Sequence, residues 1–382
     1  MSRLGLLFTL AALLVSSGAA FAAQNTCDDP FDGVTVRFST SYWTTTDFCT
    51  RSIDLSGILS GGPPPDGIPP IDNPQFESIA SASEWLAPQS PVIALEVGEV
   101  ARAYPLAILI WHEIVNDVIG SVPVAVTFCP LCNASVVFDR RVDGMTLRMG
   151  VSGNLRNSDL IMWDDQTESW WQQFTGEAIV GSLTGTQLEL VPSLVVSFAE
   201  FSAQYPDGEV LTRDTGHSRT YGSNPYAGYD STTDPFLFTG AIDPRLPATE
   251  RVLAGTIGAE AVAYPFSALA VEQVVNDMAG GDPVVALWQP GAASALDGST
   301  IDSSRDVGMA ALYSRILDGE TLTFMVDADG AIRDEGTGRR WNVFGEAVEG
   351  ELAGKRLEPQ FAAPHFWFAW AAFRPETRVY GE

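Results

Sequence analysis

The sequence predicts a β-rich α+β protein made of two tandem repeats of a mixed strand and helix unit, the second of them degenerate. Residues 101–117 and 261–277 align at a constant shift of 160 positions, and the same shift aligns 124–132 with 284–292. Both units combine short runs of β-branched and aromatic residues, typical of strands, with one longer apolar run typical of a helix. Residues found in only one unit are therefore candidates for chemistry.

The first 22 residues have the pattern of a secretory signal peptide. Arg3 precedes an apolar run from Leu4 to Val15, and Ala20-Phe-Ala22 follows as a small-residue cleavage site. The run is shorter than the ~20 apolar residues that a membrane-spanning helix needs. We therefore expect an exported protein, periplasmic or extracellular, that is soluble after cleavage and has no membrane anchor.

Residues 23–90 form an N-terminal arm rich in Ser, Thr, Gly and Pro. Such a composition predicts mostly irregular structure laid over the surface of a domain. Cys27 and Cys49 lie in the arm. Because two nearby cysteines in an oxidising compartment most simply pair, we predict a disulfide between them.

Repeat one spans 91–212 and repeat two spans 251–382. In repeat one we expect a helix over 106–115 that ends in a turn at 116–117, and a second helix over 198–205. The expected strands are 91–97, 122–128, 135–140, 145–151, 159–163, 169–174 and 187–191. Repeat two begins with the same order and a helix expected over 266–275. The connector, 213–250, is too rich in Tyr and Phe for a free linker, so we expect it to pack between the repeats.

The charge of the chain limits the class of partner. The formal net charge is −27 at pH 7, and Lys355 is the single lysine. Nucleic acids and anionic membrane surfaces attract basic proteins, so neither is expected as a partner. The remaining partners are a small molecule or another protein.

Three residues with metal-binding or redox chemistry occur in repeat one and are absent from the aligned positions of repeat two. The shift of 160 positions places His112 on Glu272, Cys129 on Gln289 and Cys132 on Ala292. The joint loss of a histidine and two cysteines is the main sign of a site.

The Cys129-Pro-Leu-Cys132 motif has three interpretations. The two thiolates could ligate one transition-metal ion (copper, iron or zinc) with His112 as the third ligand and an open fourth position. They could instead perform thiol–disulfide exchange, or form a static structural disulfide. The residues that follow, 133–138, are β-branched and aromatic, which predicts a strand–turn–strand and weakens any analogy with thioredoxin.

A second segment without a counterpart in repeat two is 153–159. Asp159 is a candidate catalytic residue beside Cys129 and Cys132, as an oxygen ligand or a proton acceptor. Asn157, Ser158 and Arg156 are candidates for binding substrate. The alternative interpretation is a polar turn built from Gly, Asn and Asp.

Several segments together resemble the domain of unknown function 3179 family. They are Trp111-His-Glu-Ile-Val-Asn-Asp117, Val126-Thr-Phe-Cys-Pro-Leu-Cys-Asn133, Gly150-Val-Ser-Gly153, Asn157-Ser-Asp-Leu160, Thr175-Gly-Glu-Ala-Ile-Val-Gly181, Asn224-Pro-Tyr-Ala-Gly-Tyr229 and Asp243-Pro-Arg-Leu-Pro247. The resemblance covers roughly residues 91–260 and implies an exported or envelope-associated prokaryotic protein. It implies no activity.

Two classes of function follow from the residues. The first is an oxidoreductase that depends on a metal or on thiols, with its site in repeat one. The second is a non-catalytic binding or scaffold protein in which Cys129 and Cys132 form a structural disulfide. A third option, independent of the cysteines, is a carbohydrate-binding module in which Trp163, Trp170 and Trp171 stack on a sugar, although aromatic residues in β-rich domains are usually core.

Overall fold

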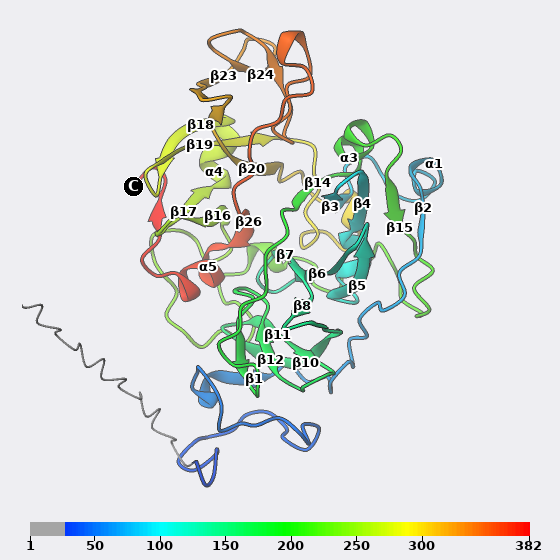
Figure 1. Ribbon diagram of the computed structural model, residues 1–382, viewed down its shortest axis with the longest axis vertical. Helices are drawn as coiled ribbons and strands as arrows, with labels where there is room; N and C mark the ends of the chain where they lie inside the picture. The colour runs from blue at the N-terminus through cyan, green and yellow to red at the C-terminus, as the bar shows by residue number, and fades with distance from the viewer. Residues whose placement is uncertain (1–26) are drawn as a thin grey trace, which may run out of the picture.

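A computed structural model describes residues 27–382 and is rich in strands, with few and short helices (Figure 1). The β-rich character predicted from the sequence is confirmed. The predicted signal peptide, 1–22, lies outside the described residues. Among residues 27–382, no helix is both long enough and apolar enough to cross a membrane.

The first large sheet has the strand order β14-β3-β4-β15-β2. The antiparallel pair β3 (Pro91–Val97) and β4 (Val100–Pro105) forms its centre, and β14 (Leu194–Ser197) pairs with β3. On the other edge, β15 (Glu209–Leu211) runs parallel to β4, and β2 (Phe76–Ser78) pairs with β15. Strands from the arm and from both ends of the predicted repeat one thus meet in one sheet.

A three-stranded antiparallel sheet carries the two cysteines of the Cys-x-x-Cys motif. Its strands are β5 (Ile114–Ile119), β6 (Val122–Cys129) and β7 (Ala134–Asp139), in that order. The side chains of β6 are almost all buried, as expected for the central strand of a sheet covered on both faces.

The predicted helices are shorter than expected. The helix expected over 106–115 is one turn, α2 (Leu106–Leu109), and the expected turn at 116–117 lies inside strand β5. The helix expected over 266–275 is α4 (Phe266–Glu272). In both places the following β-branched residues pair with a neighbouring strand, because burial in a sheet overrides the helical pattern of a short apolar run.

A third sheet, β1-β10-β11-β12-β13, delivers Asp159. Its strands are β1 (Ile58–Ser60) from the arm, β10 (Met149–Arg156), β11 (Asp159–Asp164), β12 (Trp170–Gln172) and β13 (Ala178–Val180). The strand predicted over 145–151 is divided between the hairpin of β8 (Arg141–Val142) with β9 (Met145–Thr146) and strand β10. Residues 187–191 form isolated bridges rather than the predicted strand.

The second half of the chain has sheets with a comparable strand order. In β26-β16-β17-β27, the central antiparallel pair is β16 (Arg251–Ile257) and β17 (Glu260–Pro265). Strand β26 (Ala362–Phe366) pairs with β16, and β27 (Arg378–Val379) runs parallel to β17, as β15 does to β4. A three-stranded sheet, β18 (Val274–Ala279), β19 (Asp282–Gln289) and β20 (Met309–Ser314), follows.

The remaining elements are short. They are the helices α1 (Ile79–Ala82), α3 (Phe198–Gln204) and α5 (Trp367–Phe373), the 3-10 helices η1 (Leu55–Gly57), η2 (Tyr229–Ser231), η3 (Ile301–Ser303) and η4 (Gly350–Leu352), and the strands β21 (Ile316–Leu317), β22 (Glu320–Thr321), β23 (Phe324–Val326), β24 (Ile332–Asp334) and β25 (Arg340–Trp341).

Two polar arrangements recur in the two halves. The Tyr104 hydroxyl donates to the Asp117 carboxylate at 2.6 Å, and the Tyr264 hydroxyl donates to Asp277 at 2.9 Å. A buried carboxylate also receives an indole N–H in each half, Asp164 from Trp171 and Asp334 from Trp341. In each half the second of these bonds fixes a fully buried tryptophan in the core.

The arm wraps over the third sheet, at the bottom of Figure 1. Rings of Phe38, Trp43 and Phe48 surround Trp170, with centroid separations of 5.2, 4.9 and 5.4 Å. The predicted disulfide between Cys27 and Cys49 is present. Because Trp170 is buried in this cluster and Trp171 on the core side, neither offers a face to a sugar.

Candidate functional site

The turn between β6 and β7 presents both cysteines of the motif. Cys129 ends β6 and is the register partner of Ala134, the first residue of β7. Asn133 closes the turn in the left-handed region, with φ of 50°. The predicted strand–turn–strand is confirmed, and it places Cys129 and Cys132 at one end of a buried hairpin.

A second tight turn, between β10 and β11, brings Asp159 to the same place. Arg156 and Asp159 are register partners, and the two residues between them, Asn157 and Ser158, have φ of 53° and 66°. Two successive left-handed residues are the geometry of the common two-residue hairpin turn, which Asn tolerates well. The carbonyl of Ser158 then lies 3.4 Å from the Cys132 sulfur and accepts its S–H.

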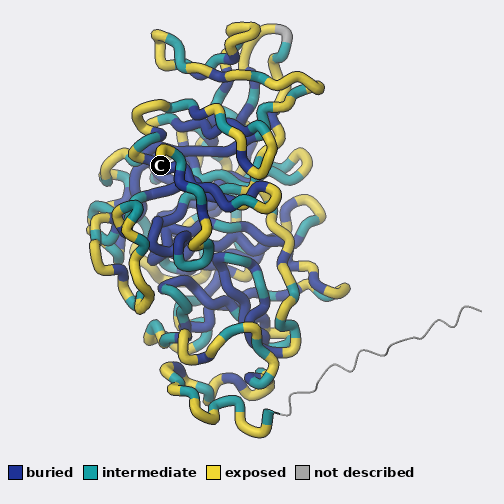
Figure 2. The backbone as a smooth tube through the Cα atoms, turned by 90° about the vertical axis from the view of Figure 1, so that its left-hand side faces the viewer, coloured by how far each residue is buried: buried dark blue, intermediate teal, exposed yellow. Residues whose placement is uncertain are grey.

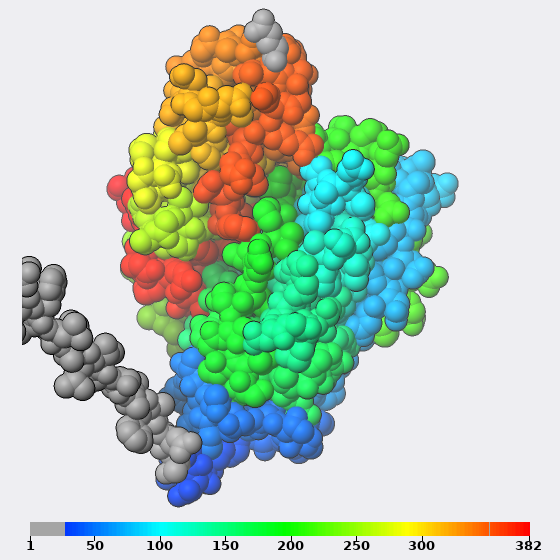
Figure 3. All heavy atoms as spheres, in the orientation of Figure 1, coloured from blue at the N-terminus to red at the C-terminus, as the bar shows by residue number. Residues whose placement is uncertain are grey.

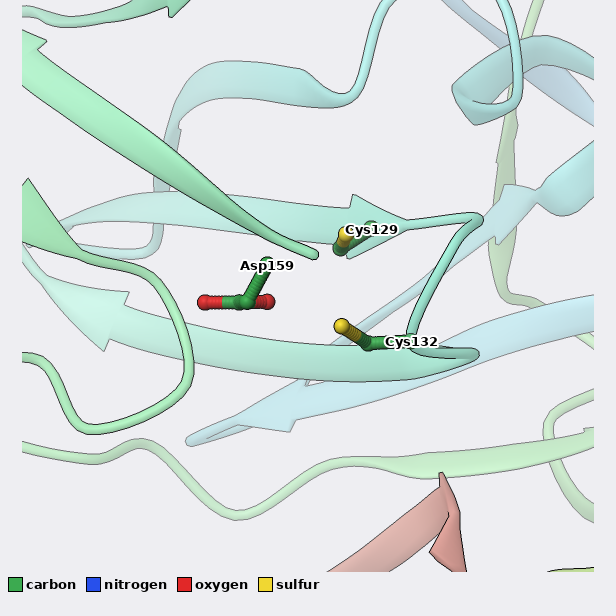
Figure 4. Close-up of side chains that lie close together, drawn as sticks. All are labelled: Cys129, Cys132 and Asp159. Carbon is green, nitrogen blue, oxygen red and sulfur yellow. The ribbon is translucent and has the colours of Figure 1, made fainter. Parts of the chain in front are cut away.

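Cys129, Cys132 and Asp159 form one compact group (Figure 4). One ligand atom from each, the two sulfurs and a carboxylate oxygen, lie within 4.8 Å of one another, and all three residues are buried. Both cysteines are free thiols. The structure therefore brings together three of the residues singled out from the sequence.

The carboxylate of Asp159 is held on one side only. Its Oδ2 accepts hydrogen bonds from Gln172 Nε2 at 2.7 Å and from the backbone N–H of Phe174 at 2.9 Å. Its Oδ1 is buried without a hydrogen-bond partner among the described residues. Burial raises the pKa of Asp159 to about 7, although the hydrogen bonds from Gln172 and Phe174, and the neighbouring thiols of Cys132 and Cys129, oppose the rise. A buried carboxylate oxygen without a partner is unusual and requires an explanation.

Burial also raises the pKa values of the two cysteine thiols. It raises the pKa of Cys129, and it raises the pKa of Cys132 well above that of a free cysteine. In the protein alone both sulfurs are thiols at neutral pH. A nucleophilic cysteine needs the opposite, a lowered pKa and access to solvent.

Glu113 is a fourth acidic group near this cluster, and the sequence interpretation did not select it. Its side chain is buried, and burial, followed by the charge of Asp159, raises its pKa to about 8. Its backbone is left-handed, with φ of 60°, and Gln273 has the same conformation 160 positions later, with φ of 59°. The position 160 residues later carries Gln273 instead of a glutamate, and this difference in the aligned sequences was the available signal.

His112 is not a member of the group. Its Nδ1 lies 2.6 Å from the carbonyl oxygen of Pro69 in the arm, and its Nε2 lies 2.7 Å from the hydroxyl of Tyr221 in the connector. Burial lowers the pKa of His112 to about 4. With both ring nitrogens in hydrogen bonds, His112 ties the arm and the connector to the turn that follows α2.

The three residues predicted to bind substrate have separate surroundings. The Ser158 hydroxyl donates to the carbonyl of Phe236 in the connector. The Arg156 guanidinium lies over the Phe373 ring, 5.4 Å from its centroid, and donates to Gln172 at 3.3 Å. Asn157 occupies the turn. Arg156 and Ser158 thus have partners within the protein.

The connector lies beside the group and contacts both halves of the chain. Its Ser223 carbonyl accepts from the Trp111 indole, and its Asn224 N–H donates to the Ser299 carbonyl. Burial raises the pKa of both Tyr229 and Tyr226. Both tyrosines pack against the hydrophobic cluster that contains Cys129 and Cys132.

Comparison with known proteins returns one family. The family described as "Protein of unknown function (DUF3179)" matches residues 65–377, a longer stretch than the segments that carry the resemblance in sequence. No curated protein and no solved structure matches the chain.

Proposed function

The chain belongs to the DUF3179 family, whose function is unknown, and we propose that Cys129, Cys132 and Asp159 bind one divalent transition-metal ion in this protein. The observation that carries the proposal is the group itself. Two sulfurs and a carboxylate oxygen lie within 4.8 Å of one another in the core, and Asp159 Oδ1 has no partner among residues 27–382. An ion bound by the three would satisfy that oxygen.

Charge supports a divalent ion. Two thiolates and one carboxylate carry three negative charges, which could not remain in a buried site without a cation. An ion would replace the thiol protons and keep the sulfurs ionised. Zinc and iron accept a mixed sulfur and oxygen ligand set, while copper(I), with a single charge, would leave more charge uncompensated. We therefore place iron and zinc before copper.

Three protein ligands leave a position for water or substrate, as in catalytic zinc sites. With iron the site would perform redox chemistry, and with zinc it would act as a Lewis acid. Glu113 is the nearby group able to exchange a proton, because its pKa of about 8 lies close to neutral pH. We propose a metal-dependent enzyme, an oxidoreductase if the metal is iron.

We also propose that the two halves of the chain arose by duplication and that the protein is exported. The comparable strand order and the paired Tyr–Asp contacts support two units of common origin, of which the second lacks the site residues. The signal-peptide pattern and the disulfide between Cys27 and Cys49 support export to an oxidising compartment.

Thiol–disulfide exchange is the second candidate, and the spacing of Cys129 and Cys132 favours it. Burial of both sulfurs and the raised pKa values oppose it, since exchange requires an accessible thiolate. A static disulfide between the two cysteines remains the non-catalytic alternative.

The test is elemental analysis by mass spectrometry of the exported protein, together with three variants. We expect about one equivalent of iron or zinc in the wild type. The metal should be lost in Cys129→Ser/Cys132→Ser and strongly reduced in Asp159→Asn, which removes the anionic ligand but keeps the shape. Glu113→Gln, the residue of the second unit, is the matched control and should keep the metal.

Two results would overturn the proposal. The first is a wild-type protein without metal after growth and reconstitution with each ion in turn. The second is equal metal content in the wild type and in the double serine variant, with unchanged circular dichroism. The reference mass is that of the protein with the Cys27–Cys49 disulfide and free thiols at Cys129 and Cys132. A mass two units lower, with no metal, would establish a disulfide between Cys129 and Cys132 instead.

A further inference from the structure

A polar cavity of about 510 Å³ lies between the second half of the chain and helix α3 of the first half. The end of β19, the residues at the start of β24 and β25, and α3 line it. In Figure 3 the orange lobe that contains β23 to β25 stands beside the green segment that contains α3. A hydrogen bond joins the two, because Asn342 Nδ2 donates to Gln204 Oε1 at 2.6 Å.

Two residues that line the cavity align with residues of the candidate site. The shift of 160 positions places Gln289 on Cys129 and Gln273 on Glu113. The backbone conformation is also shared, since Gln273 and Glu113 are both left-handed and each precedes the first strand of a three-stranded sheet. Where the first half has a thiol and a carboxyl group, the second half has two neutral amides.

A third lining residue, Asn342, corresponds to Gln172 of the first half. Each follows a buried tryptophan, Trp341 or Trp171, whose indole N–H donates to an aspartate seven positions earlier. Gln172 holds Asp159 beside the cysteines, whereas Asn342 lines the cavity. The cavity therefore has the position in the second half that the proposed metal group has in the first.

The two places differ in their access to solvent. Cys129, Cys132 and Asp159 are buried, whereas Gln273 and Gln289 are partly exposed. Figure 2 shows the same contrast along the backbone. The tube is largely dark blue, meaning buried, in the middle of the molecule, and mostly teal and yellow at the top, where β23 and β24 lie. A molecule from solvent can therefore reach the amides of the cavity.

Four polar side chains that line the cavity have hydrogen-bonding groups left over. The side chains of Gln273, Glu200 and Arg340 make no hydrogen bond or ion pair within residues 27–382. The amide of Gln289 contacts the sulfur of Met309, at 3.9 Å, and its oxygen accepts no bond from the described residues. Each amide offers donors and an acceptor, the guanidinium donates, and the carboxylate accepts.

The charges on the wall do not favour an ion. Among the described residues that line the cavity, Glu200 is the one acid and Arg340 the one base. An anion would be opposed by Glu200 and a cation by Arg340, so neither sign has a net attraction there. A sugar hydroxyl both donates and accepts, which suits a wall that offers both kinds of group. The volume lies within the normal range of small-molecule sites.

We propose that this cavity binds a neutral carbohydrate of one or two sugar rings, held by hydrogen bonds to the two glutamine amides and to the two charged groups. The bonds to Glu200 and Arg340 should contribute most, because a hydrogen bond with an ionised partner is stronger than a neutral one. Pro290, Ala331 and Val348 add apolar surface for the C–H groups of the rings. None of the three proposed metal ligands lines the cavity, so this site is independent of the metal.

Saturation-transfer difference NMR with a panel of neutral sugars tests the proposal: glucose, galactose, mannose, N-acetylglucosamine, maltose, cellobiose, lactose and trehalose. We expect at least one of them to bind, and isothermal titration calorimetry should then give one site per chain. Glucosamine and glucuronate, which carry one charge each, should bind more weakly than that sugar. The free amino acid glutamine should also bind more weakly, because its two opposite charges match Glu200 and Arg340 but it has no hydroxyl groups.

Two substitutions each remove one hydrogen-bonding side chain. Gln289→Leu keeps the approximate volume and should weaken binding of the sugar about tenfold, the value of one hydrogen bond. Arg340→Met should weaken it by at least as much, because it removes a charged donor. Both residues are at least partly exposed, so both variants should fold as the wild type does.

Val348→Trp provides the blocking variant. Val348 lines the cavity and is 46% exposed, so the larger ring fills the cavity without entering the core. It should abolish sugar binding with an unchanged thermal unfolding midpoint. Val271→Trp is the matched control and should bind as the wild type does, because Val271 on α4 is 83% exposed and does not line the cavity. Cys129→Ser/Cys132→Ser should also keep full sugar binding, which separates this site from the metal.

The proposal would be overturned if no sugar of the panel bound at concentrations up to about 10 mM, tenfold above the weak end of specific affinity. Equal binding to the wild type and to folded Val348→Trp would place the sugar elsewhere and overturn it as well. Tighter binding of glutamine or of a charged sugar than of every neutral sugar would exclude a neutral carbohydrate as the ligand. Unchanged affinity in both Gln289→Leu and Arg340→Met would contradict the assigned contacts.

Discussion

Gln172 donates a hydrogen bond from Nε2 to Oδ2 of Asp159 at 2.7 Å, and both side chains are fully buried. The bond fixes the carboxylate from the side away from its free oxygen. In metal sites, such a neighbour orients the ligand and contributes to affinity. Gln172 is therefore a positioning residue for the proposed ion.

Gln172→Met should lower metal affinity by about 10–100-fold, because it keeps the volume and removes the donor to Asp159. Competition with a chelator of known affinity measures the change. Gln173→Met is the matched control. Gln173 is equally buried but donates to Thr127 and to the carbonyl of Ala134. Equal losses of affinity in both variants would contradict the positioning role.

Asp164→Ala should lower the free energy of unfolding by about 1–3 kcal/mol or more, because it leaves the buried Trp171 indole N–H without an acceptor. Urea denaturation followed by circular dichroism measures this. In the second half, Asp334→Ala should act in the same direction through Trp341.

The double variant Asp164→Ala/Trp171→Phe supplies the control for this effect. Removing both partners leaves no orphaned N–H, so the double variant should be less destabilised than the sum of the single variants. Simple additivity would show that the hydrogen bond between Asp164 and Trp171 does not account for the loss.

Removing the disulfide with Cys27→Ser/Cys49→Ser should loosen the arm. The bond closes a loop of sequence separation 22, for which chain entropy predicts a stabilisation of about 3 kcal/mol. Because Trp43 and Trp170 lie in the cluster beneath it, their fluorescence should shift to the red, and proteolysis within residues 27–60 should accelerate. Cys129→Ser/Cys132→Ser should leave arm proteolysis unchanged; equal acceleration would contradict a local role.

His365 should make stability fall in mild acid. Its pKa is about 3 in the folded protein and about 6.5 in the unfolded chain, so below pH 6.5 the unfolded state binds a proton that the folded state does not. Stability therefore falls as pH falls. Between pH 7 and pH 5 the wild type should lose about 2 kcal/mol more than His365→Leu. Parallel curves of unfolding free energy against pH for the two proteins would exclude this linkage.

The sequence predicted the strands better than the helices. Runs such as β3 and β6 are bounded by turn residues and rich in β-branched side chains, which is a local signal. The run after Pro105 has helical spacing as well. Only its pairing with β6, a tertiary contact, makes Asn116 and Asp117 part of a strand. An Asn-Asp pair recurs 160 positions later, and its aspartate has the same role in both halves. Asp117 accepts a hydrogen bond from Tyr104, and Asp277 accepts one from Tyr264.

The candidate site likewise has some residues that a sequence pattern identifies and others whose role depends on tertiary contacts. Cys129, Cys132 and Asp159 were found because the second half lacks them, and two short turns bring them together. His112 follows the same pattern of loss, but its ring is held by Pro69 and Tyr221. Those partners come from the arm and the connector, whose placement no local pattern predicts.

The parallel edge strands have a consequence for the time at which the protein folds. Arg102 of β4 pairs with Glu209 of β15, 107 positions later, and Glu260 of β17 binds Arg378 of β27, 118 positions later. Contacts between distant positions slow folding, because the chain must close long loops before it gains their stability. During synthesis, β4 cannot form its parallel pairing until β15 has been translated, and β17 cannot form its own until β27 has been translated. Each of these two sheets is completed by the last strand of its own half, so its folding follows translation of that half instead of accompanying it.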